Sequence, residues 1–184
     1  MEGKTLYTVT IFSENTVGLL GQVTTVFIRR QINIETLSVS PSALEGIHKF
    51  TITVWSDRET IEKVVKQIDK RVDVLKSYFN VDEELIHQEI ALYKLSTPDF
   101  LKLESVEALI RKYNAQILDI NENSVVIQKT GHYAETQALF KELSEAIGVL
   151  QFIRSGRIAI NKSKIERLSD MLKTLEKKKN LIDL

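Results

Sequence analysis

The spacing of apolar residues changes period along the chain, and this change constrains the fold more than any other feature of the sequence. Tyr7, Val9 and Ile11 alternate with threonines, which is typical of a half-buried β-strand. The next apolar residues recur at helical spacing and predict an α-helix. They are Leu20, Val23, Val26 and Phe27. A chain that switches between these two periods is expected to build a sheet with helices packed on it.

The rest of the first half repeats the switch. Asp57 is a typical helix N-cap, and apolar residues at helical spacing follow it. The other predicted elements are strands at residues 34–40, 50–54 and 72–79, and a helix at residues 60–69. The order is strand–helix–strand–strand–helix–strand, which is the ferredoxin-like arrangement.

The same order is predicted a second time, after a polar stretch at residues 80–84 that we take as the domain boundary. Thr97-Pro98 starts a helix, because proline suits the first helical position. The other predicted elements are strands around residues 90–95, at 117–120, 125–128, 149–153 and 157–160, and a helix at 139–147 that ends at Gly148. The predicted class is α+β, with two ferredoxin-like (βαββαβ) domains in tandem at residues 1–80 and 81–161.

A C-terminal helix is predicted at residues 162–184. Its apolar residues lie at alternating spacings of three and four, which gives a narrow apolar seam. They are Ile165, Leu168, Leu172 and Leu175. Two interpretations remain open: the helix packs back on its own domain, or it docks on a partner chain.

The composition excludes several classes of function. Lysine plus arginine and aspartate plus glutamate both number 25, so the chain lacks the basic excess that is typical of nucleic-acid binding. The sequence has no cysteine, which excludes disulfides, zinc–thiolate sites and thiol catalysis. No apolar run approaches the length of a membrane span, and the N-terminus lacks a secretory signal. We therefore expect a cytoplasmic protein that binds neither membranes nor nucleic acid.

Catalytic residues are not predicted. His48, His87 and His132 are scattered, and none lies at metal-ligand spacing with another histidine or a carboxylate. The glycine-rich and serine motifs of nucleotide-binding proteins and hydrolases are absent from the sequence. We expect no catalytic residue, no metal site and no cofactor in this chain.

The loop at residues 13–18 is the one candidate binding site. It places Gly18 and successive backbone amides at a helix N-terminus, which suits a carboxylate. Asn15 either contacts a ligand ammonium group or caps the helix. Beyond the helix, Asn33 offers a second polar group beside the apolar Ile34. Together these residues could bind both charged groups and the side chain of a small α-amino acid, although a capped helix after a tight turn has the same pattern.

The same residues carry a family resemblance. Glu-Asn-x-x-Gly-x-Leu at residues 14–20, followed by Arg-Gln-Ile-Asn-Ile-Glu at 30–35, resembles the ACT domain of the small, regulatory subunit of acetolactate synthase. The second half is similar to that family in three segments, at residues 116–120, 124–131 and 154–159. The resemblance covers about residues 5–162 and leaves the lysine-rich tail unaccounted for.

The resemblance implies a non-catalytic subunit. It would pair with a large catalytic subunit that uses thiamine diphosphate, FAD and magnesium to make acetolactate in branched-chain amino-acid biosynthesis. It would raise the activity of that subunit and confer feedback inhibition by valine. The family's ACT domains dimerise side by side with the effector at their interface, which implies a homodimer of this chain. The valine-binding residues would be Asn15, Gly18, Asn33 and Ile34.

One position departs from the family pattern. Many relatives carry glycine where this chain has Gln31, and glycine eases a left-handed helix end. We expect glutamine to strain the helix end or to end the helix differently, which bears on the placement of Asn33.

Three alternatives remain. A free-standing ACT-type amino-acid sensor that regulates another enzyme would share the first half. A transcription regulator would need a helix-turn-helix or a basic arm, and neither is readable in the sequence. A small enzyme of ferredoxin-like fold would need convergent polar residues, which the sequence does not suggest.

Overall fold

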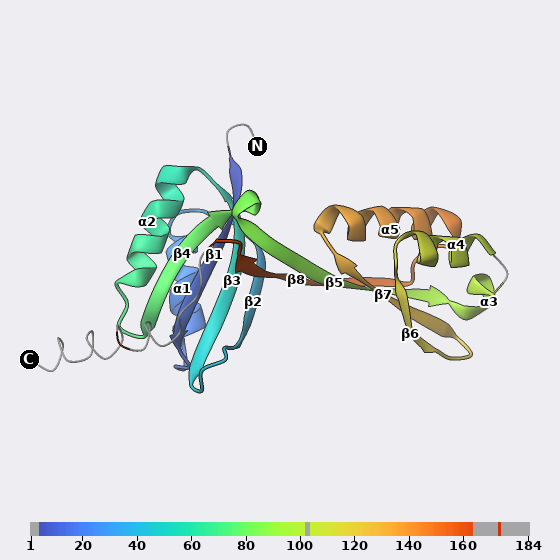
Figure 1. The fold of residues 1–184 in the computed structure, drawn as a ribbon, viewed down its shortest axis with the longest axis horizontal. Coiled ribbons are helices and arrows are strands. Elements are labelled where there is room, and N and C mark those ends of the chain that lie inside the picture. Colours follow the sequence, from blue (N-terminus) through green and yellow to red (C-terminus); the bar gives the residue numbers. More distant parts are fainter. Residues whose placement is uncertain (1–3, 102–103, 164–172, 174–184) are drawn as a thin grey trace, which may run out of the picture. The chain divides into compact units, whose positions relative to one another are not determined.

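The computed structural model describes residues 4–101, 104–163 and 173 (Figure 1). It divides into two compact units, one formed by the chain up to Ile86 and again from Ala159, and the other by His87–Ile158. The division at Ile86 lies a few residues beyond the boundary predicted at residue 80. The predicted seam of the C-terminal helix lies outside the described residues.

The first unit has one four-stranded sheet and two helices. Its elements are β1 (Thr5–Glu14), α1 (Leu19–Ile28), β2 (Ile34–Pro41), β3 (Ile47–Ser56), α2 (Arg58–Asp69) and β4 (Val74–Val81). The strand order is β2-β3-β1-β4, with antiparallel pairing of β1 to both β3 and β4 and of β2 to β3. This is the predicted βαββαβ order.

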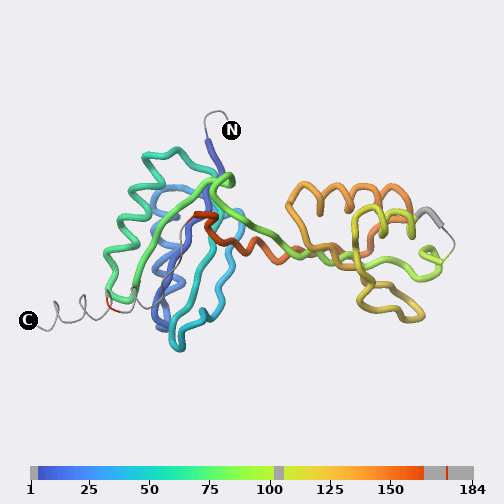
Figure 2. The backbone as a smooth tube through the Cα atoms, in the orientation of Figure 1, coloured from blue at the N-terminus to red at the C-terminus, as the bar shows by residue number. Residues whose placement is uncertain are grey.

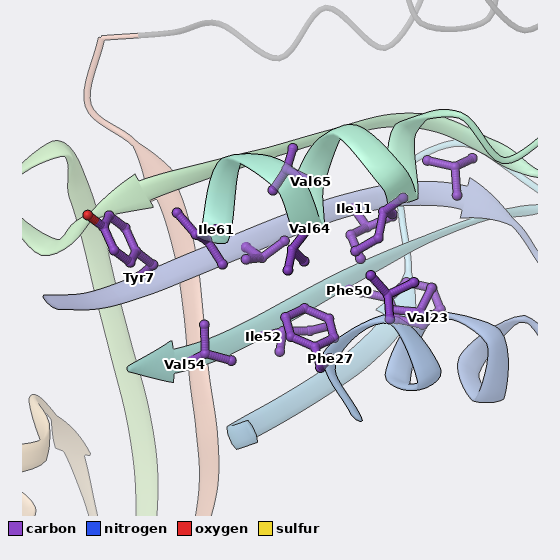
Figure 3. Packing of buried hydrophobic residues seen from close by; sticks show 14 of the residues in the cluster. Tyr7, Ile11, Val23, Phe27, Phe50, Ile52, Val54, Ile61, Val64 and Val65 are labelled. Carbon is purple, nitrogen blue, oxygen red and sulfur yellow. The ribbon is translucent and has the colours of Figure 1, made fainter. Parts of the chain in front are cut away.

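Both helices of the first unit pack on one face of its sheet and form the core. Figure 3 shows Ile11, Ile52 and Val54 of the strands directed at Phe27 of α1 and Val64 of α2. All five side chains are fully buried. The predicted helix face is shifted by one residue at its start, because Leu19 is buried whereas Leu20 is 45% exposed.

The opposite face of this sheet carries threonines that are nevertheless buried, in line with the buried Phe12. Thr8, Thr10, Thr51 and Thr53 lie on it and are each at most 5% exposed. Ala159, in the segment that returns to the first unit, lies at this face, where its carbonyl accepts a hydrogen bond of 3.1 Å from the Lys49 side chain.

The second domain repeats the order. After a single 3₁₀ turn, η1 (Asp82–Glu84), its elements are β5 (Leu85–Ser96), α3 (Thr97–Phe100), α4 (Glu104–Lys112), β6 (Gln116–Ile120), β7 (Ser124–Gly131), α5 (Tyr133–Ala146) and β8 (Gln151–Asn161). The strand order is β6-β7-β5-β8, the counterpart of the first sheet. Figure 2 follows the backbone of this domain from green at β5 to orange-red at β8. The α+β class and the two ferredoxin-like domains in tandem are therefore confirmed.

Three details of the second domain correct or add to the sequence-based expectations. The helix predicted from Thr97 onward is two helices among the described residues, since α3 ends at Phe100 and α4 begins at Glu104. In β5 the core face is formed by Ala91, Tyr93 and Leu95, whereas Ile90 and Leu92 are 44% and 36% exposed. The two segments predicted around 149–160 form one strand that begins at Gln151.

Candidate effector site

The loop from β1 to α1 ends in an open helix start. Gly18 is the N-cap of α1 and has a φ of +84°, a left-handed conformation that side chains disfavour. A Cβ at this position would meet no atom within 4 Å, so the backbone angle and not a lack of space calls for glycine. No described side chain caps this helix end. The Leu19 amide donates to the Thr16 carbonyl at 3.2 Å, so the amides available to an anionic ligand are those of Leu20 and Gly21.

Neighbouring turns hold this loop through its backbone. The Glu14 amide donates to the Asp73 carbonyl at 2.9 Å, and the Asn15 amide donates to the Gly46 carbonyl at 3.0 Å. The Asn15 side chain is exposed, as is Val17 beside it. The loop is thus anchored by the main chain while its side chains and the helix start face outward.

The other end of α1 adopts the ending that a glycine would give. Gln31 has a φ of +54°, in the left-handed region. Its amide donates to the Ile28 carbonyl at 2.9 Å, and the Ile32 amide donates to the Phe27 carbonyl at 3.1 Å. These two bonds form a Schellman motif, in which the residue after the left-handed one packs against the helix. The expectation of strain at Gln31 is confirmed, and the helix end retains its usual form.

Asn33 and Ile34 follow this helix end at the start of β2, an edge strand. Asn33 is exposed and Ile34 is half-buried against the core. The ten residues of α1 separate them from Gly18, a length of about 15 Å at 1.5 Å per residue. One chain therefore brings Asn15 together with Gly18, and Asn33 together with Ile34, but does not join the two pairs.

The sequence-based search missed an apolar surface on α1. Leu20 and Ile28 are 45% and 67% exposed. Thr24 and Thr25 lie on the same helix, and their hydroxyls donate to the Gly21 carbonyl at 3.1 and 2.7 Å. These bonds satisfy the hydroxyls within the helix, so the surface presents mainly carbon atoms. The spacing of Leu20 and Ile28, eight residues apart, could have indicated this surface, because it places both residues on one face of the helix.

The second domain holds a buried polar cluster instead of an open loop. The Glu89 carboxylate is 5% exposed and accepts hydrogen bonds from Arg154 at 2.9 and 3.1 Å and from the Thr136 hydroxyl at 2.6 Å. The Arg154 guanidinium lies over the Tyr133 ring, 4.5 Å from its centroid. Burial, together with the charge of Glu89, raises the pKa of Tyr93 well above its ordinary value. Every charge here has a partner, which favours a structural role.

Two of the histidines that the sequence left scattered meet in this domain. The His87 and His132 rings are 4.7 Å apart and edge to face. No group of three His, Asp or Glu side chains that could hold a metal ion occurs among the described residues. The part of the chain that the structure describes also has no helix long and apolar enough to span a membrane.

Fold, glycine turn and helix end together define the class of the first domain, and the comparisons agree. Residues 9–76 match the family model described as the AHAS small subunit-like ACT domain, and residues 88–163 match that of the small subunit of acetolactate synthase. The chain is thus an ACT-domain protein with a second, family-specific domain.

The relatives extend this match along the chain. It is 30% identical over 154 residues to a protein of Archaeoglobus fulgidus named "Probable acetolactate synthase small subunit", covering 84% of this chain and 95% of the relative. It is 28% identical over 167 residues to the acetolactate synthase small subunit of Bacillus subtilis, covering 90% and 95%. The solved structure of the small subunit from Thermotoga maritima is similar with a TM-score of 0.77 and 26% identity, covering 87% of this chain and 99% of that one. The chain belongs to the acetolactate synthase small-subunit family.

Proposed function

We propose that this chain is the regulatory subunit of an acetolactate synthase, which binds the large catalytic subunit, raises its activity and makes it sensitive to valine. The observation that supports this most is the match to the small-subunit family across both domains, in order and over nearly the whole relative. Thiamine diphosphate, FAD and magnesium are proposed to act in the large subunit, so this chain needs no catalytic residue of its own.

The chemistry of the candidate site suits a valine zwitterion. The open amides of Leu20 and Gly21 and the positive end of the α1 dipole favour the carboxylate. The Asn33 side-chain oxygen can accept a hydrogen bond from the ammonium group, and Ile34 offers an apolar contact for the isopropyl group. Asn15 is proposed to contact the ligand from the same loop as Gly18.

A complete site requires two copies of the chain, because the two pairs of residues lie at opposite ends of α1. The edge strand β2 has backbone groups open for pairing with a second β2. The exposed Leu20 and Ile28 on the adjoining helix provide apolar area for the same contact. We therefore propose a side-by-side homodimer of ACT domains, with Gly18 of one copy facing Asn33 of the other.

Inhibition requires that valine bind two arrangements of this dimer with different affinity, because a ligand with equal affinity shifts no equilibrium. A coupling of roughly 1–3 kcal/mol corresponds to about 5- to 150-fold inhibition.

The decisive experiment measures acetolactate formation by the matching large subunit, with and without this chain, across a valine titration. We expect stimulation by the chain and valine inhibition only in its presence. Stimulation without inhibition would support the subunit role and reject the effector site. No effect of either kind, with no large subunit recovered in a pull-down, would favour a free-standing sensor.

A further inference from the structure

The turn between α2 and β4, residues 70–73, contacts the chain on both sides of the glycine turn. On one side, the Asp73 carbonyl accepts the hydrogen bond from Glu14 at the end of β1. On the other side, the Arg71 guanidinium donates to both oxygens of Gln22, that of the side chain and, at 3.3 Å, that of the main chain.

Gln22 connects this contact to the glycine turn. Its own amide donates to the Gly18 carbonyl at 3.1 Å and so closes the first turn of α1. Arg71 therefore donates hydrogen bonds to Gln22, the residue whose amide is hydrogen-bonded to the N-cap of the helix. The planar guanidinium is suited to this role, because its fork of donors fixes the direction as well as the distance of its acceptors.

The contact costs free energy, because it buries a polar atom of Arg71 that an exposed arginine would keep in water. The Arg71 Nε atom is buried and has no hydrogen-bond partner among the described residues. Buried polar atoms without partners are rare and call for an explanation. Gln22 carries no charge, so no ion pair offsets this cost.

We propose that Arg71 is a positioning residue for the effector site: it holds the first turn of α1, and with it the amides that follow Gly18, in the geometry that binds the ligand carboxylate. This inference rests on the proposed valine site. It assigns Arg71 no contact with the ligand, since the residue acts through Gln22.

Amide hydrogen exchange of the full chain without ligand tests the positioning itself. In Arg71→Met we expect the Gln22 amide, which closes the first turn of α1, to exchange faster than in the unaltered chain, on the order of tenfold. Arg58→Met is the matched control, because Arg58 also loses one charge but pairs with Glu62 on the exposed side of α2. Equal exchange of the Gln22 amide in the two variants would overturn the proposal.

Valine binding, measured by titration calorimetry, tests the consequence. We expect Arg71→Met to weaken binding on the order of tenfold and to leave stimulation of the large subunit intact. Gln22→Leu should also weaken valine binding. The double variant should bind no more weakly than Arg71→Met alone, because the side-chain bond that Gln22→Leu removes is already lost in Arg71→Met. Additive losses would mean that Arg71 does not act through Gln22.

Arg71→Lys separates the fork from the charge. Lysine keeps the charge but cannot donate to both oxygens of Gln22 in a fixed plane, so we expect it to bind valine nearly as weakly as Arg71→Met. Full affinity in Arg71→Lys would overturn the proposal. If the unaltered chain bound no valine, the proposed function would fail, whereas the exchange experiment would still decide whether Arg71 orders the turn.

Discussion

The two domains share one plan down to individual hydrogen bonds, and they differ where a ligand would bind. In the first, the Asn15 amide donates to the Gly46 carbonyl at 3.0 Å, and in the second, the Thr97 amide donates to the Asn123 carbonyl at 3.3 Å. Both bonds join the loop after the first strand to the turn before the third. The equivalence shows that the second domain is the same fold with another sequence.

The helix after each of these loops also ends in the same way. Gln31 and Asn114 have φ angles of +54° and +48°, and in each case the next amide bonds back to the carbonyl five residues earlier. The left-handed ending is thus part of the shared plan, and neither domain uses glycine for it.

The difference lies at the start of the helix. Gly18 leaves this position open in the first domain, whereas α3 occupies the corresponding loop of the second. The Thr97 hydroxyl there donates to the Asn121 carbonyl at 2.7 Å, which ties the loop to the β6–β7 turn. One plan therefore yields an open loop suited to a ligand in the first domain and a closed one in the second.

The largest effect is expected from the buried ion pair of the second domain, Glu89 with Arg154. Arg154→Met leaves the Glu89 carboxylate buried without its cation, and removing one partner of such a pair costs about 3–5 kcal/mol. The single tryptophan, Trp55, lies in β3 of the first domain. We expect the unfolding midpoint in urea to fall when it is followed by circular dichroism and to stay unchanged when it is followed by Trp55 fluorescence.

Arg111→Met is the control for this experiment. Arg111 pairs with Glu107 in the same domain, but both side chains are more than 60% exposed, and such pairs contribute about 0.2–1 kcal/mol. Equal losses in the two variants would show that the Glu89 cluster is not the structural centre of the second domain.

Gly18→Asp is expected to have the next largest effect, on ligand binding. It places a negative charge beside the proposed position of the effector carboxylate, which costs roughly 1–4 kcal/mol at 4 Å for effective dielectric constants between 80 and 20. Valine inhibition should therefore weaken about 5- to 1,000-fold while stimulation of the large subunit remains, as measured by acetolactate formation.

Gly148→Asp matches this substitution in the second domain. Gly148 also has a left-handed φ, +77°, and also lacks any atom within 4 Å of a Cβ, so backbone strain and charge are the same. We expect valine inhibition to be unchanged. Full valine sensitivity in Gly18→Asp would remove Gly18 from the site.

The two left-handed helix ends should respond unequally to glycine. A residue other than glycine in the left-handed conformation costs roughly 1–2 kcal/mol. Glycine avoids this cost but loses more chain entropy on folding, which offsets about 0.5–1 kcal/mol of the gain. Gln31→Gly should therefore stabilise the first domain by about 0.5–1 kcal/mol in urea unfolding followed by Trp55 fluorescence. Asn114→Gly should gain less, because asparagine tolerates this conformation. A loss of stability in Gln31→Gly would show that the glutamine side chain is itself stabilising.

Most of the first domain could be predicted from the sequence, because the spacing of its apolar residues distinguishes the strands from the helices. Gly18, the N-cap Asp57 and the βαββαβ order all followed from local patterns. The buried face of β5 did not, since the strand carries apolar residues on both faces, Ile90 and Leu92 as well as Ala91 and Tyr93. The apolar pattern therefore did not show which face was buried.

Contacts between residues far apart in the sequence were the other feature that the sequence could not predict. Glu89 and Arg154 are 65 residues apart, and no local pattern pairs them. The same holds for the hydrogen bonds from Arg71 to Gln22, 49 residues away. The Schellman ending at Gln31 was obscured for another reason: residue preference argued against it, whereas packing of Ile32 against the core favours it.

The smallest expected effect concerns the second helix of each domain, which the two domains cap differently. At α2 the Asp57 carboxylate accepts a hydrogen bond from the Thr60 amide at 2.8 Å. At α5 the contact runs the other way, and the Glu135 side chain accepts from the amide of the N-cap residue His132 at 2.8 Å. Of these two helices, only α2 has a titratable N-cap carboxylate.

The hydrogen bond from the Thr60 amide, followed by that from the Thr60 side chain, lowers the pKa of Asp57 below its ordinary value. The stabilisation is therefore complete above about pH 4, the pKa of an unfolded aspartate, and is lost as the pH falls through the lower folded value. The asparagine side chain in the variant Asp57→Asn would cap about equally well but would not titrate. We expect equal urea midpoints at pH 7 and a smaller decline for the variant between about pH 4 and pH 2, followed by Trp55 fluorescence. Identical declines would mean that the acid sensitivity of the first domain arises from other carboxylates.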